Sequence, residues 1–464
     1  MNGRTRWEWQ CGAISKPALP GMGTLSLHNA ILLLALGPLA YYLLALWAST
    51  AYFRTSKRQV AGSRAFWPPV SILKPVRGLD REAFKNFASF CALNYPEYEI
   101  LFCVSDAADE AVPVIEELQR QFPDRTIRLL IGAPMLGASG KVNKLCRLVQ
   151  EARYDILVIS DSDVRVAPTY LQEVTAPLED SRVGAVTVFF KSAVNGSAGA
   201  TLDAVGSGVE FAASALLARR LEGVHFTLGA TMATTKEVLA KIGGFEALVN
   251  HYVDDYELGR RIFGLGYRIE FAPTPVCMIY PRESLRQFLR HELRWTIGLR
   301  NVRPGGHVAM GLILGLPWTV LAILAAPTAW VAWFYALAYL TLRLAVYFVI
   351  GVWGLQDEVV RRKWWLIPFR DAAAFGVWLA SFFSNRILWR GLEFRVKHGL
   401  LIPIRQAGHC APVVARSGER HATLEVFERP LQRSAALMEP AVDFAAQRIP
   451  ANEVALKKTH ELSR

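Results

Sequence analysis

Carboxylates follow two apolar stretches of strand length in this sequence. Asp106 comes just after Ile100–Val104, and Asp161 and Asp163 come directly after Ile156–Ser160. An Asp-x-Asp pair at a strand end brings two hard oxygen ligands within reach of one divalent ion, and Mg²⁺ or Mn²⁺ in such a site often bridges to phosphate oxygens. An acidic turn or a helix cap is the alternative interpretation, since Asp is common in both. The repetition of the pattern at two strand ends favours a site.

A third acidic group, Asp254-Asp255, precedes a helix-like stretch that begins near Leu258. Carboxylates at a helix N-terminus can also simply complement the helix dipole, so this group is ambiguous by itself. Further along the chain, His291 and Arg294-Trp295 lie in a basic and aromatic segment close to an apolar block. Such a segment is also typical of anchoring at a membrane interface.

The elements that must position these residues alternate between strands and helices. Near-continuous apolar strands separated by helices indicate a mostly parallel sheet that is buried on both faces, and ligands bind beyond the carboxyl ends of such strands. Neither a P-loop nor a Gly-x-Gly-x-x-Gly motif occurs. The predicted strands are Val70–Leu73, Ile100–Val104, Ile127–Ile131, Ile156–Ile159 and Ala185–Phe189, and the clearest helices are Asp109–Gln121 and Asn143–Ala152.

Composition places the chain outside the ordinary soluble enzymes. The 464 residues are 52% apolar and 20% charged, which excludes a disordered chain and a disulfide scaffold. Leu25–Phe53 contains no charged residue over 29 positions, and about 20 such residues span a bilayer core. Val308–Trp353 fits a hairpin of two spans with a turn near Ala326-Pro327, and Ala372–Trp389 either spans or lies at the interface.

The net charge of +12 is concentrated beside these apolar segments. Arg54, Lys57, Arg58 and Arg64 follow the first apolar segment, so the positive-inside rule predicts that the domain after residue 54 is cytoplasmic. The excess charge favours an anionic membrane surface over nucleic acid, because no aromatic-basic RNA motif accompanies it. We therefore expect an integral membrane protein of the bacterial inner membrane or an equivalent membrane.

Five segments follow from this pattern. They are a short tail (1–24), a transmembrane anchor (25–53), a cytoplasmic α/β domain with interfacial helices (54–306), a C-terminal transmembrane region (307–392) and a mostly disordered tail (393–464).

Taken in order, the motifs resemble those of the ceramide glucosyltransferase family. The succession runs Val-Ser-Asp106, Gly-Lys141-Val-Asn-Lys and Asp161-Ser-Asp163, and it continues through Gly-Gly-Phe245, Asp-Asp255-Tyr and Arg294-Trp295. The resemblance covers roughly residues 25–400. It implies a membrane-bound, inverting glycosyltransferase with an α/β catalytic domain of the GT-A (Rossmann-like) type, a mostly parallel sheet, and transmembrane helices on both sides.

The resemblance also implies roles for individual residues. Asp106 matches the family aspartate that helps to hold the uridine end of the donor, and Lys141 matches a lysine near the nucleotide. Asp161 matches the second family aspartate, and with Asp163 it would hold Mg²⁺ or Mn²⁺. Asp255 matches the general base.

The motif that ends in Arg294 and Trp295 carries a departure from the family pattern. His291 stands where the family has Gln or Arg, and its charge near neutral pH is conditional. A histidine can still donate to a phosphate. All three residues are therefore assigned to donor binding.

The implied reaction is transfer of glucose or N-acetylglucosamine from a UDP-sugar to a hydroxyl of a membrane lipid, giving a β-linked glycolipid. Ceramide-like lipids and hopanoids are both candidate acceptors, because some bacterial relatives use hopanoids. A processive polysaccharide synthase of the cellulose or hyaluronan type is an alternative, although it needs more spans. A non-catalytic, membrane-anchored nucleotide-sugar binding protein is a second alternative, although all three acidic groups are intact.

Overall fold

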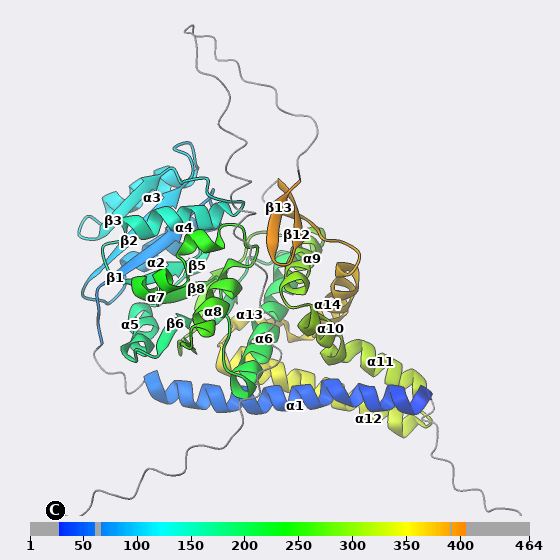
Figure 1. Ribbon diagram of the computed structural model, residues 1–464. Helices are drawn as coiled ribbons and strands as arrows, with labels where there is room; N and C mark the ends of the chain where they lie inside the picture. Colours follow the sequence, from blue (N-terminus) through cyan, green and yellow to red (C-terminus); the bar gives the residue numbers. More distant parts are fainter. Residues whose placement is uncertain (1–26, 61–65, 390–391, 405–464) are drawn as a thin grey trace, which may run out of the picture. The chain divides into compact units, whose positions relative to one another are not determined.

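The computed structural model describes residues 27–60, 66–389 and 392–404, and Figure 1 shows the order of the elements along this part of the chain. It begins with one long apolar helix, α1 (Leu27–Val60). An α/β region follows, and a group of further helices and a small sheet complete the described residues. The tail predicted beyond residue 404 lies outside the described residues, as does the predicted short tail 1–24.

A mixed sheet of seven strands, in the order β3-β2-β1-β4-β8-β6-β9, forms the centre of the α/β region. Strand β8 pairs antiparallel with both β4 and β6, and all the other strands of this sheet run in one direction. The predicted fold class, a mostly parallel sheet with apolar helices on both sides of it in the sequence, is confirmed. The strands are β1 (Val70–Pro75), β2 (Tyr98–Val104), β3 (Thr126–Ile131), β4 (Ile156–Ser160), β6 (Val183–Thr187), β8 (Thr231–Thr235) and β9 (Arg268–Phe271).

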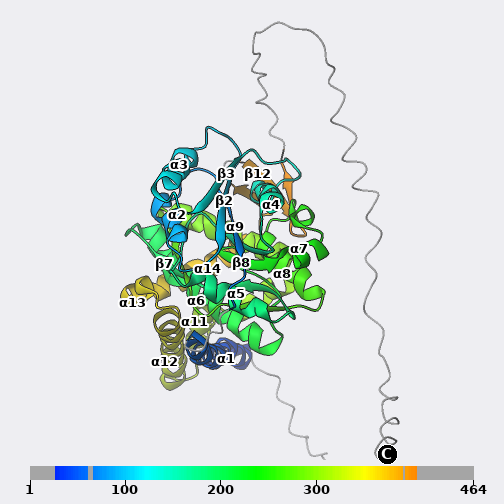
Figure 2. The ribbon, with the colours of Figure 1, turned by 90° about the vertical axis from the view of Figure 1, so that its left-hand side faces the viewer.

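Helices cover both faces of this sheet, which explains why its strands read as continuous apolar runs. On one face, α2 (Ala83–Cys91) and α3 (Ala111–Gln121) pack against alternate residues of β1 and β2, such as Ile72 and Phe102. On the other face, α4 (Gly140–Glu151) packs against Leu73 and Leu101. Figure 2 shows α2 and α3 on one side of the strands and α4 on the other.

Short elements connect the later strands and lead to the candidate site. They are α5 (Tyr170–Thr175), the 3₁₀ helix η1 (Ala176–Glu179), α7 (Lys236–Lys241), η2 (Phe245–Leu248) and α8 (Asp254–Gly264). A second sheet, β5-β10-β7, joins β5 (Val164–Arg165), β10 (Val276–Ile279) and β7 (Phe190–Ala193).

Two long helices connect this region to the apolar helices. They are α6 (Ala198–Leu221) and α9 (Leu285–Val302), and they pack on each other. The remaining helices are α10 (Pro304–Ile313), α11 (Gly315–Ala325), α12 (Ala329–Val346), the π-helix η3 (Tyr347–Gly354), α13 (Glu358–Lys363), the 3₁₀ helix η4 (Trp364–Leu366) and α14 (Ile367–Ser381).

Two helices, Leu27–Ser56 and Ala329–Gly354, are long and apolar enough to cross a membrane. The bent pair α10 and α11 becomes a third span if its two parts, which meet at 48°, are counted together. The predicted turn near Ala326 lies where α11 ends and α12 begins. Figure 1 shows α1 alongside α11 and α12.

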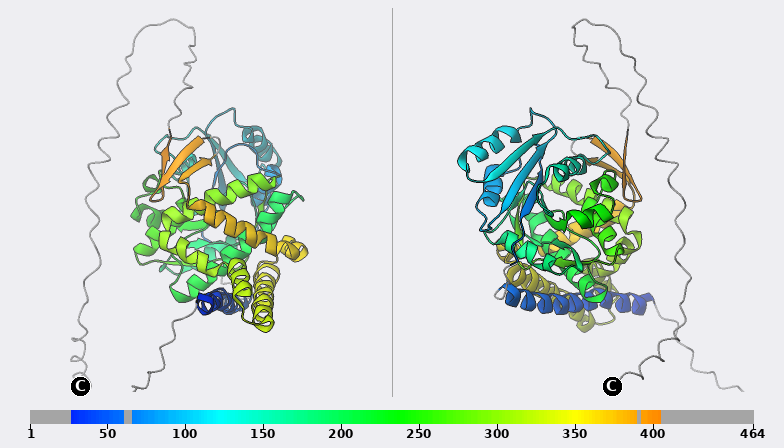
Figure 3. Two further views of the ribbon diagram at one scale, coloured as in Figure 1. Left: turned by 90° about the vertical axis from the view of Figure 1, so that its right-hand side faces the viewer. Right: turned by 60° about the vertical axis from the view of Figure 1, so that its left-hand side comes forward.

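The stretch after Ala372 does not form one helix. Helix α14 ends at Ser381, and β11 (Arg386–Trp389) then pairs with β12 (Leu392–Lys397), which pairs with β13 (Leu400–Pro403). Figure 3 shows this third sheet in orange. Residues 393–403, which the sequence placed in the disordered tail, therefore form strands, because Ile387, Phe394, Val396 and Leu401 bury their side chains in a small core with Tyr252 and Ile297.

Candidate active site

The candidate site lies at the carboxyl ends of β1, β2 and β4. The chain proceeds from β1 through β2 to β3 on one side and places β4 on the other side of β1. The direction of strand order therefore reverses between β1 and β4, and this is where open parallel sheets bind ligands. Asp161 and Asp163 follow β4 at this position.

Lys141 is the centre of a group of three carboxylates from two distant segments. Its Nζ lies 2.8 Å from Asp161 Oδ1 and 3.7 Å from Asp254 Oδ2. Gly229 lies against the same group, because a Cβ there would be 3.2 Å from Asp255 Oδ2, 3.3 Å from Asp161 Oδ2 and 3.5 Å from Lys141 Nζ. The structure thus brings together the predicted residues Lys141, Asp161 and Asp255, which lie up to 114 positions apart in the sequence.

The N-terminus of α4 holds Lys141 in this place. The Ser139 hydroxyl caps the helix by accepting from Val142 N, and Ser139 N donates to Val249 O. Asn250 Oδ1 also accepts from Ala138 N. Because residues 249–250 lie just before the acidic pair 254–255, these bonds fix α4 and the acidic pair relative to each other.

Each carboxylate oxygen of Asp255 accepts a hydrogen bond from a backbone N–H group. Gly229 N donates to Oδ2 at 2.8 Å and Tyr256 N donates to Oδ1 at 2.8 Å. Burial, and next the neighbouring charge of Asp254, raise the pKa of Asp255 to about 7. A carboxylate with a pKa near neutrality matches the requirement for a general base at that pH.

Lys141 remains the cation of this group. Burial by itself would lower the pKa of Lys141, but the carboxylates of Asp161, Asp254 and Asp255 outweigh burial and raise that pKa above its usual value. One fixed positive charge therefore faces three carboxyl groups. The excess of negative charge suits a site that binds a cation or transfers a proton.

Behind the Asp161–Asp163 turn lies a buried lysine that sequence reasoning did not select. Lys74, on β1, donates to Asp161 O at 2.9 Å, and its Nζ lies 3.7 Å from the centre of the Phe90 ring. Burial lowers the pKa of Lys74 to about 7. Asp163 has one buried oxygen, Oδ1, without a hydrogen-bond partner, and burial, followed by the charge of Asp161, raises the pKa of Asp163 to about 7.

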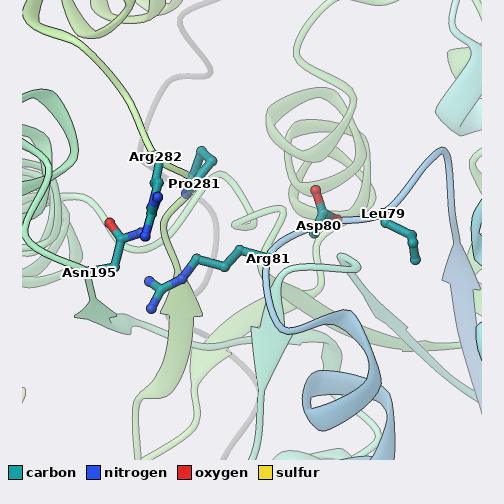
Figure 4. A pocket seen from close by; sticks show the side chains of 6 residues that line it. All are labelled: Leu79, Asp80, Arg81, Asn195, Pro281 and Arg282. Atoms are coloured by element: carbon teal, nitrogen blue, oxygen red, sulfur yellow. The ribbon is translucent and has the colours of Figure 1, made fainter.

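A cavity of about 490 Å³ lies next to this turn, lined by Leu79, Asp80, Arg81, Asn195, Pro281 and Arg282. Figure 4 shows Arg81 and Asp80 on the loop after β1, with Asn195 and Arg282 on the other side. Asp80 accepts a hydrogen bond from the hydroxyl of Ser162, the middle residue of the Asp-x-Asp pair. The two arginines give this cavity positive charge beside the acidic turn.

Asp106 is not part of the Lys141 group. It is exposed after the end of β2, where Oδ1 accepts from Ala108 N in a local turn at 2.9 Å. β2 and β4 flank β1 on opposite sides, so Asp106 and Asp161 lie beyond the same edge of the sheet.

Helix α9 carries Arg294 and Trp295 and packs on the segment just before the acidic pair. Tyr252 and Arg294 exchange hydrogen bonds, with Arg294 Nη1 donating to Tyr252 Oη at 3.4 Å and Tyr252 Oη donating to Arg294 O at 3.3 Å. A Cβ at Gly298 would lie 2.3 Å from the Tyr252 ring, so the helix and this tyrosine are in close contact. Arg294 is thereby placed beside the segment that ends in Asp255.

His291 occupies a different environment on the same helix. Its Nε2 accepts from Trp295 Nε1 at 2.8 Å, and its Nδ1 lies 3.3 Å from Asp203 Oδ2 and 3.9 Å from Glu283 Oε1. The described contacts of His291 are therefore with α6 and with the loop before α9. Within the described part of the chain, His291 forms no hydrogen bond or ion pair with Lys141, Asp161 or Asp255.

A comparison with known proteins places the chain in a family. The sequence profile of glycosyl transferase family 21 matches residues 30–402. The chain belongs to glycosyl transferase family 21. The resemblance to ceramide glucosyltransferases that the motif order indicated is confirmed, and the membership covers both the sheet and the apolar helices of this family 21 protein.

Individual relatives are distant. Ceramide glucosyltransferase 3 of Caenorhabditis elegans is 27% identical over 229 residues, covering 49% of this chain and 50% of the worm protein. The probable glycosyltransferase YdaM of Bacillus subtilis is 23% identical over 276 residues, covering 57% and 64%. The chain thus spans about half the length of the curated relatives it matches.

Among solved structures, the chain is similar to the mannosyltransferase PcManGT of Pyrobaculum calidifontis. The TM-score is 0.42 at 18% identity, and the match covers 75% of this chain and 99% of the archaeal one.

Several site residues of this family 21 protein were missed by sequence reasoning. The sequence offered a reason to select Lys74, because it directly follows the apolar residues of the predicted strand Val70–Leu73. The same holds for Asp80, which lies a few residues further along the chain. The sequence offered no reason to select Gly229, because a single glycine far from any motif acquires its importance only from the carboxylates that the fold places around it.

Proposed function

We propose that this protein transfers a hexose, glucose or N-acetylglucosamine, from a UDP-sugar to a hydroxyl group of a membrane lipid, with inversion at the anomeric carbon. The observation that carries the proposal is the convergence of Lys141, Asp161 and Asp255 around Gly229 at the strand-order reversal. Family membership and the ceramide glucosyltransferase relatives support the lipid acceptor.

Asp255 is the proposed general base. The acceptor hydroxyl loses its proton as it attacks the anomeric carbon, and a carboxylate with a pKa of about 7 can accept that proton near neutral pH. Two backbone donors fix its orientation. Attack from the face opposite the leaving group gives a β-linked product from an α-linked donor.

The second requirement of the reaction is that the negative charge on the departing diphosphate be stabilised. Asp161 and Asp163 are the proposed ligands of a divalent ion, Mg²⁺ or Mn²⁺, and the unpartnered buried Oδ1 of Asp163 fits this role. Such an ion would neutralise negative charge on the diphosphate. Lys141, and Arg294 beside Tyr252, are the cations that this chain itself supplies.

Asp106 keeps its proposed role at the nucleoside end of the donor. Its position beyond β2, on the same edge of the sheet as Asp161, leaves room between the two residues for an extended nucleotide-sugar. His291 and Trp295 remain proposed donor-side residues of the motif, although His291 faces α6 and Trp295 is half exposed.

The acceptor is proposed to approach along α9. Leu285, Leu289, Trp295 and Leu299 are exposed on this helix, and their spacing places them within one stripe of it. An apolar stripe bordered by basic residues is typical of a helix that lies in a membrane interface. The exposed Arg361 and Arg362 on α13 fit a cytoplasmic location of the catalytic region.

The test uses the full-length protein, purified in detergent and returned to lipid nanodiscs. Labelled UDP-glucose and UDP-N-acetylglucosamine are each offered with ceramide or with a hopanoid polyol, and the products are analysed by mass spectrometry and by NMR of the anomeric proton. We expect one hexosyl unit per lipid in a β linkage with one of these pairs.

Other products would point elsewhere. A polymer would favour a polysaccharide synthase, and an α-linked product would remove the inverting mechanism. Donor binding without transfer to any lipid or to water would favour a binding protein. The Asp255→Asn variant, prepared identically, provides the blank for each assay.

A further inference from the structure

We propose that Asp203, Glu283 and His291 form a binding site for a divalent transition metal, with Zn²⁺ as the preferred ion. This site shares no residue with the Asp161–Asp163 pair. It lies between the first half of α6, which carries Asp203, and the start of α9, which carries His291, with Glu283 in the loop before α9.

The spacing of the three ligand atoms fits one ion. One atom from each residue lies within 4.8 Å of the other two, and His291 Nδ1 is 3.3 Å from Asp203 Oδ2 and 3.9 Å from Glu283 Oε1. Tetrahedral Zn²⁺ bound at its usual distances needs about 3.3–3.4 Å between ligand atoms. Small side-chain rotations therefore bring all three atoms into position.

Each of the three residues has one side-chain atom without a hydrogen-bond partner in the described structure. These atoms are Asp203 Oδ2, Glu283 Oε2 and His291 Nδ1, and all are buried. The side chain of Asp203 is only 3% exposed, so water cannot readily satisfy its oxygen. Buried polar atoms are nearly always paired. Here the long contact of 3.3 Å between His291 Nδ1 and Asp203 Oδ2 is the only pairing among these atoms in the described residues, which leaves capacity for a further ligand.

Charge also favours a cation here. In the described part of the chain, the ion pairs of Asp203 and Glu283 are with His291 alone. The buried guanidinium of Arg370 also acts on Asp203 through its charge, but its ion pairs are with Glu210 at 3.2 Å and Glu292 at 2.8 Å. The two carboxylates thus have one imidazole as their shared ion-pair partner, and a divalent ion would balance their negative charge.

The three ligands are held by a rigid junction rather than by free loops. Gly199 N donates to Glu283 O at 3.0 Å, and a Cβ at Gly199 would lie only 2.4 Å from Ser284 O, so the start of α6 is packed against the loop. Ser284 and Gln287 form a capping box that fixes the first turn of α9. Such support limits the reorganisation needed to bind a metal.

The donor set indicates the class of metal. One imidazole nitrogen with two carboxylate oxygens suits Zn²⁺ or a neighbouring transition metal better than Mg²⁺ or Ca²⁺, which prefer oxygen ligands alone. Three protein ligands leave a fourth position open. His291 and Glu283 are partly exposed, so that position can take water or a hydroxyl of a substrate.

Trp295 reports on the occupancy of the site. Its indole N–H donates to His291 Nε2, and in a neutral imidazole this leaves the proton on Nδ1, the proposed ligand atom. A metal on Nδ1 moves the proton to Nε2, and two donors then face each other. The indole, half exposed, must therefore turn away when the metal binds.

The experiment uses Co²⁺ as a visible probe for the Zn²⁺ site. The full-length protein is stripped with chelator, titrated with Co²⁺ in the absence of donor and acceptor, and followed by its visible absorption, with metal content measured by mass spectrometry. We expect a band of a four- or five-coordinate site that saturates at one equivalent and is abolished by one equivalent of Zn²⁺.

Variants tie this band to the three residues. His291→Gln inserts the residue usual in the family at this position and should fold, yet it should lose the band, as should Asp203→Asn. Asp163→Asn should keep the band, and so should His225→Gln, which alters a partly exposed histidine stacked on Phe263. Trp295→Phe removes the competing hydrogen bond and should tighten Co²⁺ binding about 5-fold.

Two outcomes would overturn the proposal. One is the absence of the band in the folded wild-type protein, which would mean that a proton shared between Asp203 and His291 satisfies the cluster. The other is an undiminished band in His291→Gln.

Discussion

Two groups of ionised side chains in this protein differ in how their charges are balanced. At the strand ends, Lys141 faces Asp161, Asp254 and Asp255, a single cation among three carboxyl groups. Between α6, α9, α12 and α14, two arginines face three carboxylates in a chain of ion pairs, running from Asp371 through Arg343, Glu210 and Arg370 to Glu292.

In the second group, which we call the helix ion chain, each of the three carboxylates is paired with at least one arginine, and Arg370 Nε is the buried nitrogen left without a partner. Asp371 accepts from Arg343 and also from the Tyr339 hydroxyl at 2.6 Å, and both guanidinium groups are buried. At the strand ends, by contrast, the pKa of Asp255 is raised to about 7 and Asp163 leaves a buried oxygen unpaired. Carboxylates that are each paired with an arginine suit a structural link between helices. Carboxylates in excess over the neighbouring cations suit a site that binds ions or transfers protons.

The largest expected effect is at the strand ends. Asp255→Asn keeps the shape of the side chain and removes the base, so we expect turnover to fall about 10²-fold or more. UDP-sugar affinity should stay within a factor of about two, since the amide can still accept from Gly229 N. Steady-state kinetics and calorimetric titration measure the two quantities separately.

Asp124→Asn, an exposed aspartate after α3, is the matched control for Asp255→Asn. It should leave both turnover and affinity unchanged. Near-normal turnover in Asp255→Asn would remove Asp255 from the role of base.

Substitutions in the helix ion chain should change the stability of the protein rather than its turnover. Arg370→Met leaves the partly buried Glu292 without its cation and Glu210 with Arg343 alone, and breaking a pair with a buried arginine costs at most about 3 kcal/mol. We expect a lower thermal unfolding midpoint in detergent, with part of the loss recovered in the double variant Arg370→Met/Glu292→Gln.

Arg361→Met is the comparison for Arg370→Met, because it breaks an exposed pair with Glu358. Exposed pairs contribute little to stability, so its unfolding midpoint should be unchanged. Equal midpoints in Arg361→Met and Arg370→Met would contradict a structural role for the helix ion chain.

Gly229→Ala tests the close approach at the strand ends. The added methyl would lie 3.2 Å from Asp255 Oδ2 and 3.3 Å from Asp161 Oδ2, so both carboxylates must move by a few tenths of an ångström. We expect turnover to fall about tenfold, since reacting groups tolerate little misplacement. Circular dichroism should show an unchanged fold.

Gly264→Ala is the control for Gly229→Ala, because no atom lies within 4 Å of the added methyl at the end of α8. Its turnover should equal that of the wild type. A wild-type rate in Gly229→Ala would mean that the carboxylates are not held where the structure places them.

The last test is the pH dependence of kcat/KM in the wild-type protein. The pKa of Asp255 is raised from its usual value to about 7, and only the ionised form accepts a proton. We therefore expect kcat/KM to rise about tenfold per pH unit below 7 and to level off above it. A profile that is flat from pH 5.5 to 8 would place the base elsewhere.

Much of the fold was predictable because its signals are local. β1, β2, β3 and β4 cover the four runs of apolar residues that predicted them, and α3 and α4 lie where helices were expected. The fifth predicted strand, Ala185–Phe189, overlaps β6 and ends two residues beyond it. The strand ends then singled out Asp106, Asp161 and Asp163 as candidates, because ligands bind beyond the carboxyl ends of parallel strands.

Other features have no local signal. The reversed direction of β8 depends on its partners β4 and β6. The strands after Arg386 alternate too briefly to predict, and they exist because their buried residues meet Tyr252 and Ile297. Arg343 and Arg370 read as interruptions or flanks of apolar segments, whereas both are buried and paired with acidic residues from other helices.

The sequence by itself determined the class of fold, the apolar helices and the family, because these depend on residue type and order along the chain. Only the tertiary structure decided that Gly229 lies among three charged groups, that Lys74 is buried behind the acidic turn, and that His291 faces Asp203 and Glu283. The physical reason is that charge balance and close approach depend on distances between segments that are remote in sequence.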